Sequence, residues 1–278
     1  MDCRHVVALG REIKVLTGKT IIVTGGTSGI GWAIARAAYA AGANVLLHGL
    51  DGGDAQRRAA SLGRRAAPAG GDLTQSGELE KLVPLAVSAF GRVDGLVNNA
   101  AVMTRDNLDS TSAAMHEAIM AINSRVPMLL CQQVVRQFRE QKTGGAIVNI
   151  GSINAYCGQD NILSYSMAKG ALQTMTRNLG DALGCEKIRV NQLNVGWTCT
   201  ENEDRLQQSE GRPANWHEEV PDVFAPSGRL LYPEDIAPHV IFWLSDQSGP
   251  VNGQVYEVEQ YPLIGRNKIN LNKRGNDA

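Results

Sequence analysis

The chain has 278 residues, of which 43% are hydrophobic, and its 27 basic and 28 acidic side chains give a formal net charge of −1. This length and apolar content suit one large α/β domain or two small ones, and the near-neutral charge argues against binding to nucleic acid or to an anionic membrane. The five cysteines form no C-x-x-C pair, so they indicate neither a disulfide framework nor a zinc site, but reduced thiols in a cytoplasmic protein.

Short apolar runs alternate with longer amphipathic segments along the chain. The predicted strands are Thr20–Val23, Asn44–His48, Ala66–Ala69, Arg92–Val97, Ala146–Ile150, Ile188–Leu193 and Gln254–Val258. The predicted helices are Ile30–Ala41, Asp54–Leu62, Ser76–Phe90, Ser112–Gln141, Tyr165–Leu183 and Pro233–Leu244. Such alternation is typical of a parallel sheet covered on both faces, so we expect a doubly wound α/β Rossmann fold with a seven-stranded, mostly parallel sheet.

No linker or repeat divides the chain, so we expect one Rossmann-fold domain over residues 1–278 with a core from about 16 to 260. The apolar run Val6–Leu9 is too short for a signal peptide, and no run approaches 18 apolar residues, so we expect a soluble, unexported protein. The polar segment 198–227 follows a late strand, where α/β sheets place ligand-contacting loops, and is predicted to be a substrate loop. The polar tail 261–278 is either partly disordered or packed on a neighbouring subunit.

The first predicted strand runs directly into a glycine-rich turn. The turn reads Thr24-Gly25-Gly26-Thr27-Ser28-Gly29-Ile30-Gly31 and leads into the first predicted helix. Glycine lets the backbone turn tightly and approach a pyrophosphate, whose negative charge is stabilised at a helix N-terminus. A glycine cluster can be an ordinary loop, but its place between a strand and a helix predicts a dinucleotide site.

A serine, a tyrosine and a lysine form the most informative set of polar residues. Tyr165 and Lys169 are four residues apart, which places them on one face of a helix, and Ser152 lies thirteen residues before the tyrosine. An ammonium beside a phenol favours the phenolate, so we expect the pKa of Tyr165 to fall towards working pH, where it can exchange a proton with an alcohol. An isolated Tyr-x-x-x-Lys pair is more often a surface pair on a solvated helix.

Further landmarks lie at the ends of the other predicted strands. They are Asp72-Leu73, Asn98-Asn99-Ala100, Asn123 in the long helix, and Asn194–Thr200. With the glycine turn and the trio, their order and spacing resemble those of the short-chain dehydrogenase/reductase family over residues 16 to 256. The resemblance implies an NAD(P)-dependent oxidoreductase that interconverts a secondary alcohol and a ketone.

The resemblance implies a role for each catalytic candidate. Tyr165 would be the general acid/base on the substrate oxygen, Lys169 would lower its pKa and bind the nicotinamide ribose, and Ser152 would hydrogen-bond the substrate oxygen. Asn123 would hold a water that links Lys169 to solvent. The expected substrate contacts are Ser152, Asn154, Gln159, Tyr165 and Trp197, although Trp197 is equally compatible with a core position.

The same resemblance implies a set of cofactor contacts, drawn from the turn, the strand ends and the start of the substrate loop. They are Gly25, Thr27, Ser28, Gly29, Ile30, Gly31, Leu50, Asp51, Asp72, Leu73, Asn99, Ala100, Tyr165, Lys169, Gly196, Thr198 and Thr200. An acid at the end of the second strand usually selects NAD, because it binds the ribose 2′-hydroxyl and repels a 2′-phosphate. Here Gly49 occupies that position and Asp51 lies two residues later, while Arg57 and Arg58 are interpreted as surface charges. We expect NAD rather than NADP.

The substrate side is polar, because the residues around the trio and in the segment 198–227 are mainly polar. This favours a hydroxylated small molecule such as a sugar, polyol or hydroxy acid over a steroid or a long acyl chain. The alternatives are a 3-oxoacyl or other carbonyl reductase of the same family, and a catalytically silent nucleotide-binding sensor. In the family the last helix and strand form a tetramer contact, so a homotetramer is expected, with a homodimer as the alternative. No metal, nucleic acid or membrane partner is expected.

Overall fold

The computed structural model describes residues 14–156 and 158–263, and these form a seven-stranded parallel sheet in the order β3-β2-β1-β4-β5-β6-β7. The strands are β1 Thr20–Val23, β2 Asn44–Gly49, β3 Ala66–Gly70, β4 Gly95–Asn98, β5 Gly145–Ser152, β6 Ile188–Val195 and β7 Val255–Val258. Every neighbouring pair is parallel. The predicted doubly wound sheet is therefore confirmed.

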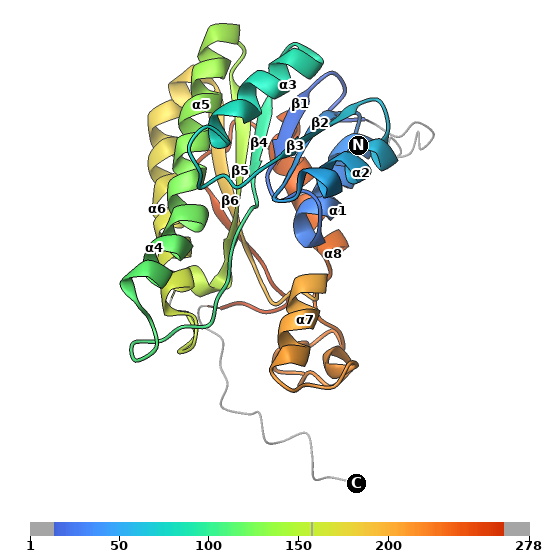
Figure 1. Ribbon diagram of the computed structural model, residues 1–278. Helices are drawn as coiled ribbons and strands as arrows, with labels where there is room; N and C mark the ends of the chain where they lie inside the picture. Colours follow the sequence, from blue (N-terminus) through green and yellow to red (C-terminus); the bar gives the residue numbers. More distant parts are fainter. Residues whose placement is uncertain (1–13, 157, 264–278) are drawn as a thin grey trace, which may run out of the picture.

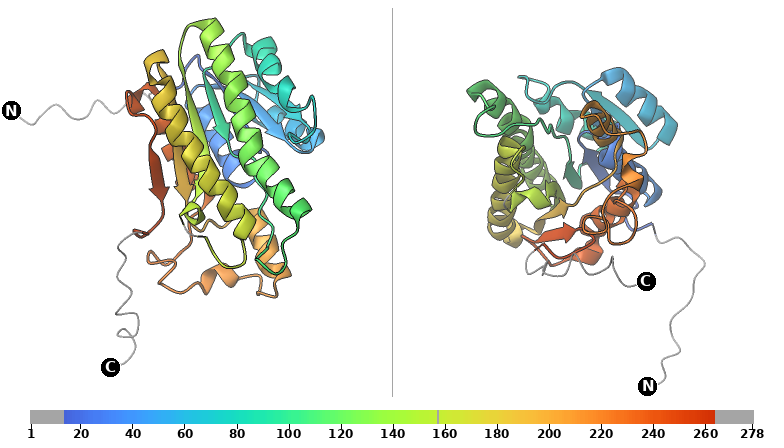
Figure 2. Two further views of the ribbon diagram at one scale, coloured as in Figure 1. Left: turned by 90° about the vertical axis from the view of Figure 1, so that its left-hand side faces the viewer. Right: turned by 90° about the horizontal axis from the view of Figure 1, so that it is seen from below.

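Helices cover both faces of this sheet (Figure 1). They are α1 Gly29–Ala40, α2 Gly52–Leu62, α3 Leu82–Phe90, α4 Ala113–Met120, α5 Val126–Gln141, α6 Leu163–Leu183, α7 Glu201–Ser209 and α8 Pro233–Leu244. The helices α1 and α8 pack on one face, and α5 and α6 cover the near face in the left view of Figure 2. The path β1-β2-β3 runs one way from β1 and the later strands run the other, so the chain reverses between β1 and β4.

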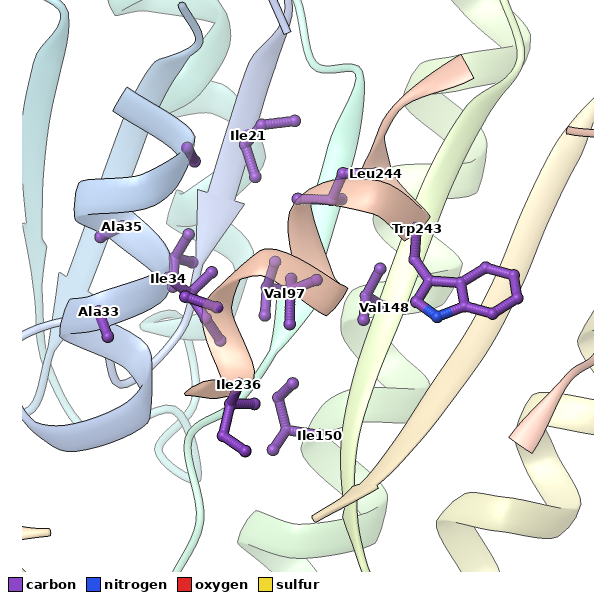
Figure 3. Close-up of a cluster of buried hydrophobic side chains, with 14 of the residues drawn as sticks. Ile21, Ala33, Ile34, Ala35, Val97, Val148, Ile150, Ile236, Trp243 and Leu244 are labelled. Atoms are coloured by element: carbon purple, nitrogen blue, oxygen red, sulfur yellow. The ribbon is translucent and has the colours of Figure 1, made fainter. Parts of the chain in front are cut away.

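The alternation of side chains along β1 explains why the sheet is buried on both faces. Ile21 and Val23 belong to the cluster on the α1/α8 face, whereas Ile22 between them belongs to the cluster on the opposite face. Figure 3 shows Ile21 of β1 near Leu244 of α8 within the first cluster. Apolar residues on both faces of a strand are typical of parallel sheets covered by two helical layers.

The long predicted helix 112–141 is interrupted in the middle by a wider turn. The helices α4 and α5 are joined without a break by a π-helical segment, Ala121–Arg125, which contains the candidate residue Asn123. By length and composition alone the run Ala113–Gln141 could cross a membrane. Its side chains Leu130, Val134 and Phe138 are buried in the core against the sheet, which is the arrangement of a core helix.

The segment from 198 to 227 differs from the expected irregular loop, because it contains the helix α7 (Figure 1). Thr200 caps this helix, since its Oγ1 accepts a hydrogen bond from the backbone N–H of Glu203 at 3.1 Å. A small cluster of Trp216, Ala225 and Leu230 gives the segment a core of its own. The T-x-x-E pattern of a helix start was the sequence signal that could have predicted α7. We call residues 198–231 the α7 segment.

Several predictions concern residues that the structure does not describe. The apolar run near the N-terminus and most of the tail 261–278 lie outside the described residues, as do Cys3 and Cys157. The thiols of Cys131, Cys185 and Cys199 are free, in agreement with the expectation of reduced cysteines for these three residues.

Candidate active site

The candidate residues gather at the carboxyl edge of the sheet, where open α/β sheets bind their ligands. The glycine turn follows β1, Asn99 follows β4, Ser152 ends β5 and Gly196 follows β6. Because β1, β4, β5 and β6 are neighbours in the sheet, segments far apart in sequence meet along one edge. The reversal between β1 and β4 is a switch point of the sheet, and open α/β sheets bind dinucleotides outside the carboxyl ends of the strands at such a point.

The glycine turn has a backbone that only glycine adopts easily. Gly25 has φ +60° and Gly29 has φ +49°, both in the left-handed region. At Gly31 the reason is space, since a Cβ there would lie 2.1 Å from the carbonyl oxygen of Gly25. Asn99 fixes the turn from outside, because its Nδ2 donates to the carbonyl oxygens of Thr24 at 2.9 Å and Gly25 at 3.0 Å. The expected cofactor residue Asn99 therefore supports the shape of the turn.

The start of α1 suits an anion. The residue before the helix, Ser28, makes no side-chain capping hydrogen bond, and the first turn of α1 contains no acidic residue. The N–H groups at a helix N-terminus lack partners within the helix and carry partial positive charge, which favours phosphate oxygens. In α7, by contrast, Thr200 supplies a cap and the first turn contains Glu201, Glu203 and Asp204. The residues at the glycine turn thus fit a dinucleotide pyrophosphate.

At the end of β2 the structure explains why the usual acidic position holds glycine. A Cβ on Gly49 would lie 2.4 Å from Cγ2 of Thr27, so the glycine turn occupies the space of a side chain there. Leu50 is 74% exposed. Asp51 caps α2, because its Oδ1 accepts a hydrogen bond from the N–H of Asp54 at 2.9 Å. Hydrogen bonds from the backbone of Asp54 and of Gly53 lower the pKa of Asp51. Asp51 is the acidic side chain that follows β2.

Asp72 is engaged by its own turn. Its Oδ1 accepts from the backbone N–H of Thr74 at 2.9 Å and from the Thr74 hydroxyl at 2.7 Å. Both hydrogen bonds lower the pKa of Asp72, and the one from the backbone N–H has the larger effect. The next residue, Leu73, is buried in the core. Asp72 therefore stabilises the turn after β3, and an adenine contact would be an additional role.

His48, a buried residue beside the glycine turn, was not identified from the sequence. Its Nε2 lies 2.9 Å from the carbonyl oxygen of Gly71, so Nε2 carries the proton, and its Nδ1 accepts from the N–H of Gly25 at 3.4 Å. Burial lowers the pKa of His48, so the ring is neutral at neutral pH. His48 joins the glycine turn to the turn that leads to Asp72, and no local sequence signal predicts such a contact.

The structure brings the three candidate catalytic residues together. Ser152 is buried at the end of β5, its Oγ accepts from the N–H of Asn154 at 3.1 Å, and its side chain hydrogen-bonds Tyr165. Lys169 is also buried, its Nζ donates to the carbonyl oxygen of Ile150 at 2.7 Å and lies 5.5 Å from the centre of the Tyr165 ring. A serine, a phenol and an amine therefore meet at the carboxyl edge of the sheet.

The predicted fall in the pKa of Tyr165 is wrong for the protein chain by itself. Burial raises the pKa of Tyr165 to about 12, while the hydrogen bond with Ser152 opposes the rise and the charge of Glu203 adds to it. Burial also lowers the pKa of Lys169 to about 8, because it disfavours the ammonium form. In the chain by itself Lys169 therefore loses its proton at a lower pH than Tyr165 does, and its ammonium form is no longer present when the phenolate forms.

Asn123 lies in the π-helical segment and is 1% exposed. Its Nδ2 donates to the carbonyl oxygens of Val102 at 2.8 Å and Ile119 at 3.0 Å, and its Oδ1 accepts from the N–H of Val102 at 3.3 Å. Both amide hydrogens are thus used to hold the loop after β4 against the helix. π-Helical turns recur at functional sites, and the proton relay stays a prediction.

The remaining candidates lie where β6 leads into the α7 segment. Trp197 stacks on Trp216 with ring centres 5.6 Å apart, and its indole N–H donates to Oε1 of Glu203 at 2.9 Å. The Thr198 hydroxyl donates to the carbonyl oxygen of Gly196 at 3.0 Å. A Cβ at Gly29 would lie 3.4 Å from Cγ2 of Thr200, so the segment starts against the glycine turn.

Two expected substrate residues lie on the segment after β5. Asn154 is half-buried and donates its N–H to Ser152, whereas Gln159 is exposed. Glu203 is one of the polar residues of the predicted substrate loop, and it lies near enough for its charge to act on Tyr165. The capping pattern that predicts α7 would also have pointed to Glu203, as the residue in its first turn.

Comparisons with known proteins agree with this arrangement. The family model described as Enoyl-(Acyl carrier protein) reductase matches residues 24–260. The 2-(S)-hydroxypropyl-CoM dehydrogenase 3 of Xanthobacter autotrophicus is 35% identical over 88% of this chain and 96% of that protein. The L-rhamnose 1-dehydrogenase (NAD(P)(+)) of Sphingomonas sp. is 32% identical over 89% of this chain and 97% of that protein. A solved structure, 3-ketoacyl-(acyl-carrier-protein) reductase from Brucella melitensis complexed with NADH, has TM-score 0.78 and 28% identity over 88% of this chain and 98% of that one.

The fold and the glycine turn define the class of dinucleotide-binding α/β oxidoreductases. Within that class, the chain belongs to the short-chain dehydrogenase/reductase family. It is therefore an NAD(P)-dependent oxidoreductase of alcohols and ketones, and the family predicted from the sequence is confirmed.

Proposed function

We propose that the protein interconverts a secondary alcohol and a ketone on a small, polar, hydroxylated substrate, with Tyr165 as the acid/base and NAD as the preferred cofactor. The observation that carries the proposal is the meeting of Ser152, Tyr165 and Lys169 at the carboxyl edge of the sheet, on the same edge as a turn that fits a pyrophosphate. The proposal treats residues 16–260 as one catalytic domain and the α7 segment as its substrate side.

The cofactor, when bound, supplies the hydride acceptor or donor. Ser152 would hydrogen-bond the substrate oxygen and hold it beside the phenol of Tyr165, with which it already shares a hydrogen bond. In alcohol oxidation Tyr165 accepts the hydroxyl proton, and in ketone reduction it donates that proton. Lys169 would hold the ribose and pass the proton onward, with Asn123 positioning a water next to it.

The polar residues around the site support a hydroxylated substrate. The negative charge of Glu203 disfavours a substrate that is itself negatively charged. Glu203 acts electrostatically on Tyr165, and Arg105 near it is already paired with Glu210, so a carboxylate close to the reacting carbon would meet repulsion. One relative acts on L-rhamnose and another solved neighbour on 3-ketoacyl groups, so a neutral sugar or polyol is our first choice and an oxoacyl thioester the second.

A substrate panel tests this proposal. With NAD⁺ and NADP⁺, we expect measurable oxidation of neutral sugars and polyols such as L-rhamnose and D-sorbitol, weaker oxidation of hydroxy acids such as D-gluconate, and none of steroids. The measurement is the initial rate of NAD(P)H absorbance at fixed substrate concentration. Activity restricted to steroids or to β-ketoacyl thioesters in the reverse direction would contradict the proposed substrate class.

The preference for NAD rests on the charges around Asp51. An exposed carboxylate at the end of β2 disfavours a 2′-phosphate nearby. The neighbouring arginines already have partners, because Arg57 pairs with Asp54 and the guanidinium of Arg58 lies 4.7 Å from the centre of the Trp32 ring. Both guanidinium groups are thus engaged by other side chains and are not free to bind the 2′-phosphate of NADP.

Asp51→Ser should shift the cofactor preference. Serine can still cap α2, but it removes the negative charge, so we expect the ratio of kcat/KM for NADP to that for NAD to rise at least tenfold, or about 1.4 kcal/mol. Asp109→Asn, which removes an exposed carboxylate from a different loop, is the matched control and should leave the ratio unchanged. A wild-type enzyme that already prefers NADP tenfold would refute the assignment to NAD.

Assembly and location complete the proposal. The helix α8 and strand β7 expose Phe242 and Tyr256, which lie together with Pro238, His239 and Trp243 around a hollow of about 280 Å³. An apolar surface of this kind supports a self-association contact, and we propose a homotetramer in the cytoplasm.

A further inference from the structure

The short loop segment Arg105-Asp106, between β4 and α4, contacts two elements that are distant in sequence. Arg105 reaches the end of α7: its Nε lies 2.7 Å from Oε1 of Glu210, and its Nη2 lies 3.2 Å from Oε2. This is a two-pronged ion pair, and it joins residues 105 positions apart. The loop and the α7 segment both lie at the carboxyl edge of the sheet, below the strands in Figure 1.

The adjacent residue, Asp106, is tied to the start of α6. Asp106 forms an isolated parallel β-bridge with Ile162, in which its N–H donates to the carbonyl oxygen of Asn161 at 3.0 Å and its carbonyl accepts from Leu163 at 3.1 Å. Its carboxylate accepts from the backbone N–H of Ser164, at 3.1 Å to Oδ1 and 3.2 Å to Oδ2. The side chains of Asp106 and Ser164 are 2% and 1% exposed, so this contact is shielded from water.

The carboxylate of Asp106 takes the place of a local helix cap. The residue at the N-cap of α6, Ile162, offers no side-chain cap, and the first turn of α6 contains no acidic residue. A negative charge at this position satisfies an unpaired N–H and stabilises the positive end of the helix. His116 of α4 completes the contact, with its Nδ1 3.0 Å from the Ser164 hydroxyl. Ser164 directly precedes Tyr165, so Asp106 holds the turn that carries the phenol.

We propose that Arg105 and Asp106 form a strap that links the position of α7 to the orientation of Tyr165. Asp106 is a positioning residue for the acid/base Tyr165. The Arg105–Glu210 ion pair holds the end of α7 against the same loop. The inference rests on the proposed function in one respect, the role of Tyr165. The electrostatic contacts agree with the strap, because Glu203 of α7 acts on both Arg105 and Tyr165.

Two contacts of the candidate site depend on where the α7 segment lies. Thr200 lies against Gly29 of the glycine turn, and Trp197 is fixed by its hydrogen bond to Glu203. If α7 moves away, these contacts move with it. Losing the strap should therefore loosen α7 and the first turn of α6 together, because the two residues that hold them are adjacent in the chain.

Hydrogen–deuterium exchange of the full chain, with and without NAD⁺, tests the strap without requiring turnover. Arg105→Gln should raise exchange at least fivefold in both residues 201–210 and residues 163–166. Arg205→Gln is the matched control, because Arg205 is an exposed arginine of α7 whose side chain bonds only within that helix, to Glu201 and Asn202. No increase in either peptide, or an increase confined to 201–210, would overturn the coupling.

Kinetics test the positioning role, with L-rhamnose or the fastest panel alcohol as the probe. Asp106→Ala should lower kcat at least tenfold with the Kd for NAD⁺ within threefold, because misplacing a reacting group by about 1 Å costs up to 10²-fold. Asp106→Asn retains an oxygen for the Ser164 N–H and should recover most of kcat, and Asp109→Ala should match wild type. An unchanged kcat in Asp106→Ala, while Tyr165→Phe is inactive, refutes the strap and leaves the proposed function standing. If Asp106→Ala does not fold, the exchange result for Arg105→Gln decides.

Discussion

Tyr165→Phe is expected to lower kcat by about 10²–10⁴-fold while the Kd for NAD⁺ stays within about twofold of wild type. Phenylalanine keeps the half-buried ring in its place and removes only the oxygen that shares a hydrogen bond with Ser152. Proton exchange with the substrate oxygen is then lost, whereas the glycine turn that fits the pyrophosphate is untouched. The measurements are steady-state kinetics with the best panel alcohol and NAD⁺ titration of tryptophan fluorescence.

The pH profile gives this prediction a second readout. With the pKa of Tyr165 raised to about 12 in the chain by itself, the phenolate that accepts a proton grows with pH through the neutral and alkaline range. Wild-type alcohol oxidation should therefore rise from pH 7 to 10, and Tyr165→Phe should lack that rise. Tyr156→Phe, an exposed phenol on the segment after β5, is the control. Wild-type turnover in Tyr165→Phe would show that another group transfers the proton.

Sequence reasoning predicted the fold well because the relevant signals are local. The strand β1 and the helix α8 match their predicted bounds, Thr20–Val23 and Pro233–Leu244, since an apolar run and an N-terminal proline define them. The meeting of Ser152 with Tyr165 also follows from local placement, at the end of β5 and in the first turn of α6. Among the α-helices in the described part of the chain, α7 is the one that the sequence analysis missed.

The parts that sequence reasoning missed depend on contacts between distant residues. The bond between His48 and Gly71, and that between Asp106 and Ser164, join strand ends and loops that only the assembled sheet brings together. The pKa values of Tyr165 and Lys169 were misjudged for a related reason. A spacing of four residues indicates that two side chains share a helix face, but not that the amine is buried and directed to a carbonyl of β5 or that the phenol is half-buried.

Lys169→Met is expected to abolish turnover and, at neutral pH, to make the protein more stable. Lys169 is 3% exposed, and the fall of its pKa from 10.5 to about 8 corresponds to about 3 kcal/mol of cost for burying the charged form. Methionine has a similar shape without the charge, and it leaves the Ile150 carbonyl without its partner, which costs about 1–3 kcal/mol. The net expectation is a gain of about 1 kcal/mol at pH 7, seen as a higher urea midpoint.

The sign of the pH dependence distinguishes this explanation from better packing. Below about pH 8 the lysine is protonated in both the folded and unfolded states, so the cost is constant. Between about 8 and 10.5 the unfolded chain binds more protons than the folded one, so wild-type stability rises with pH relative to the variant. The stability difference between Lys169→Met and wild type should therefore fall by about 2 kcal/mol from pH 8 to 9.5, so that the variant, which is the more stable form at pH 7, becomes the less stable one. Lys187→Met, at an exposed lysine, should show no such change, and an advantage that is independent of pH would rule out a charge-burial cost at Lys169.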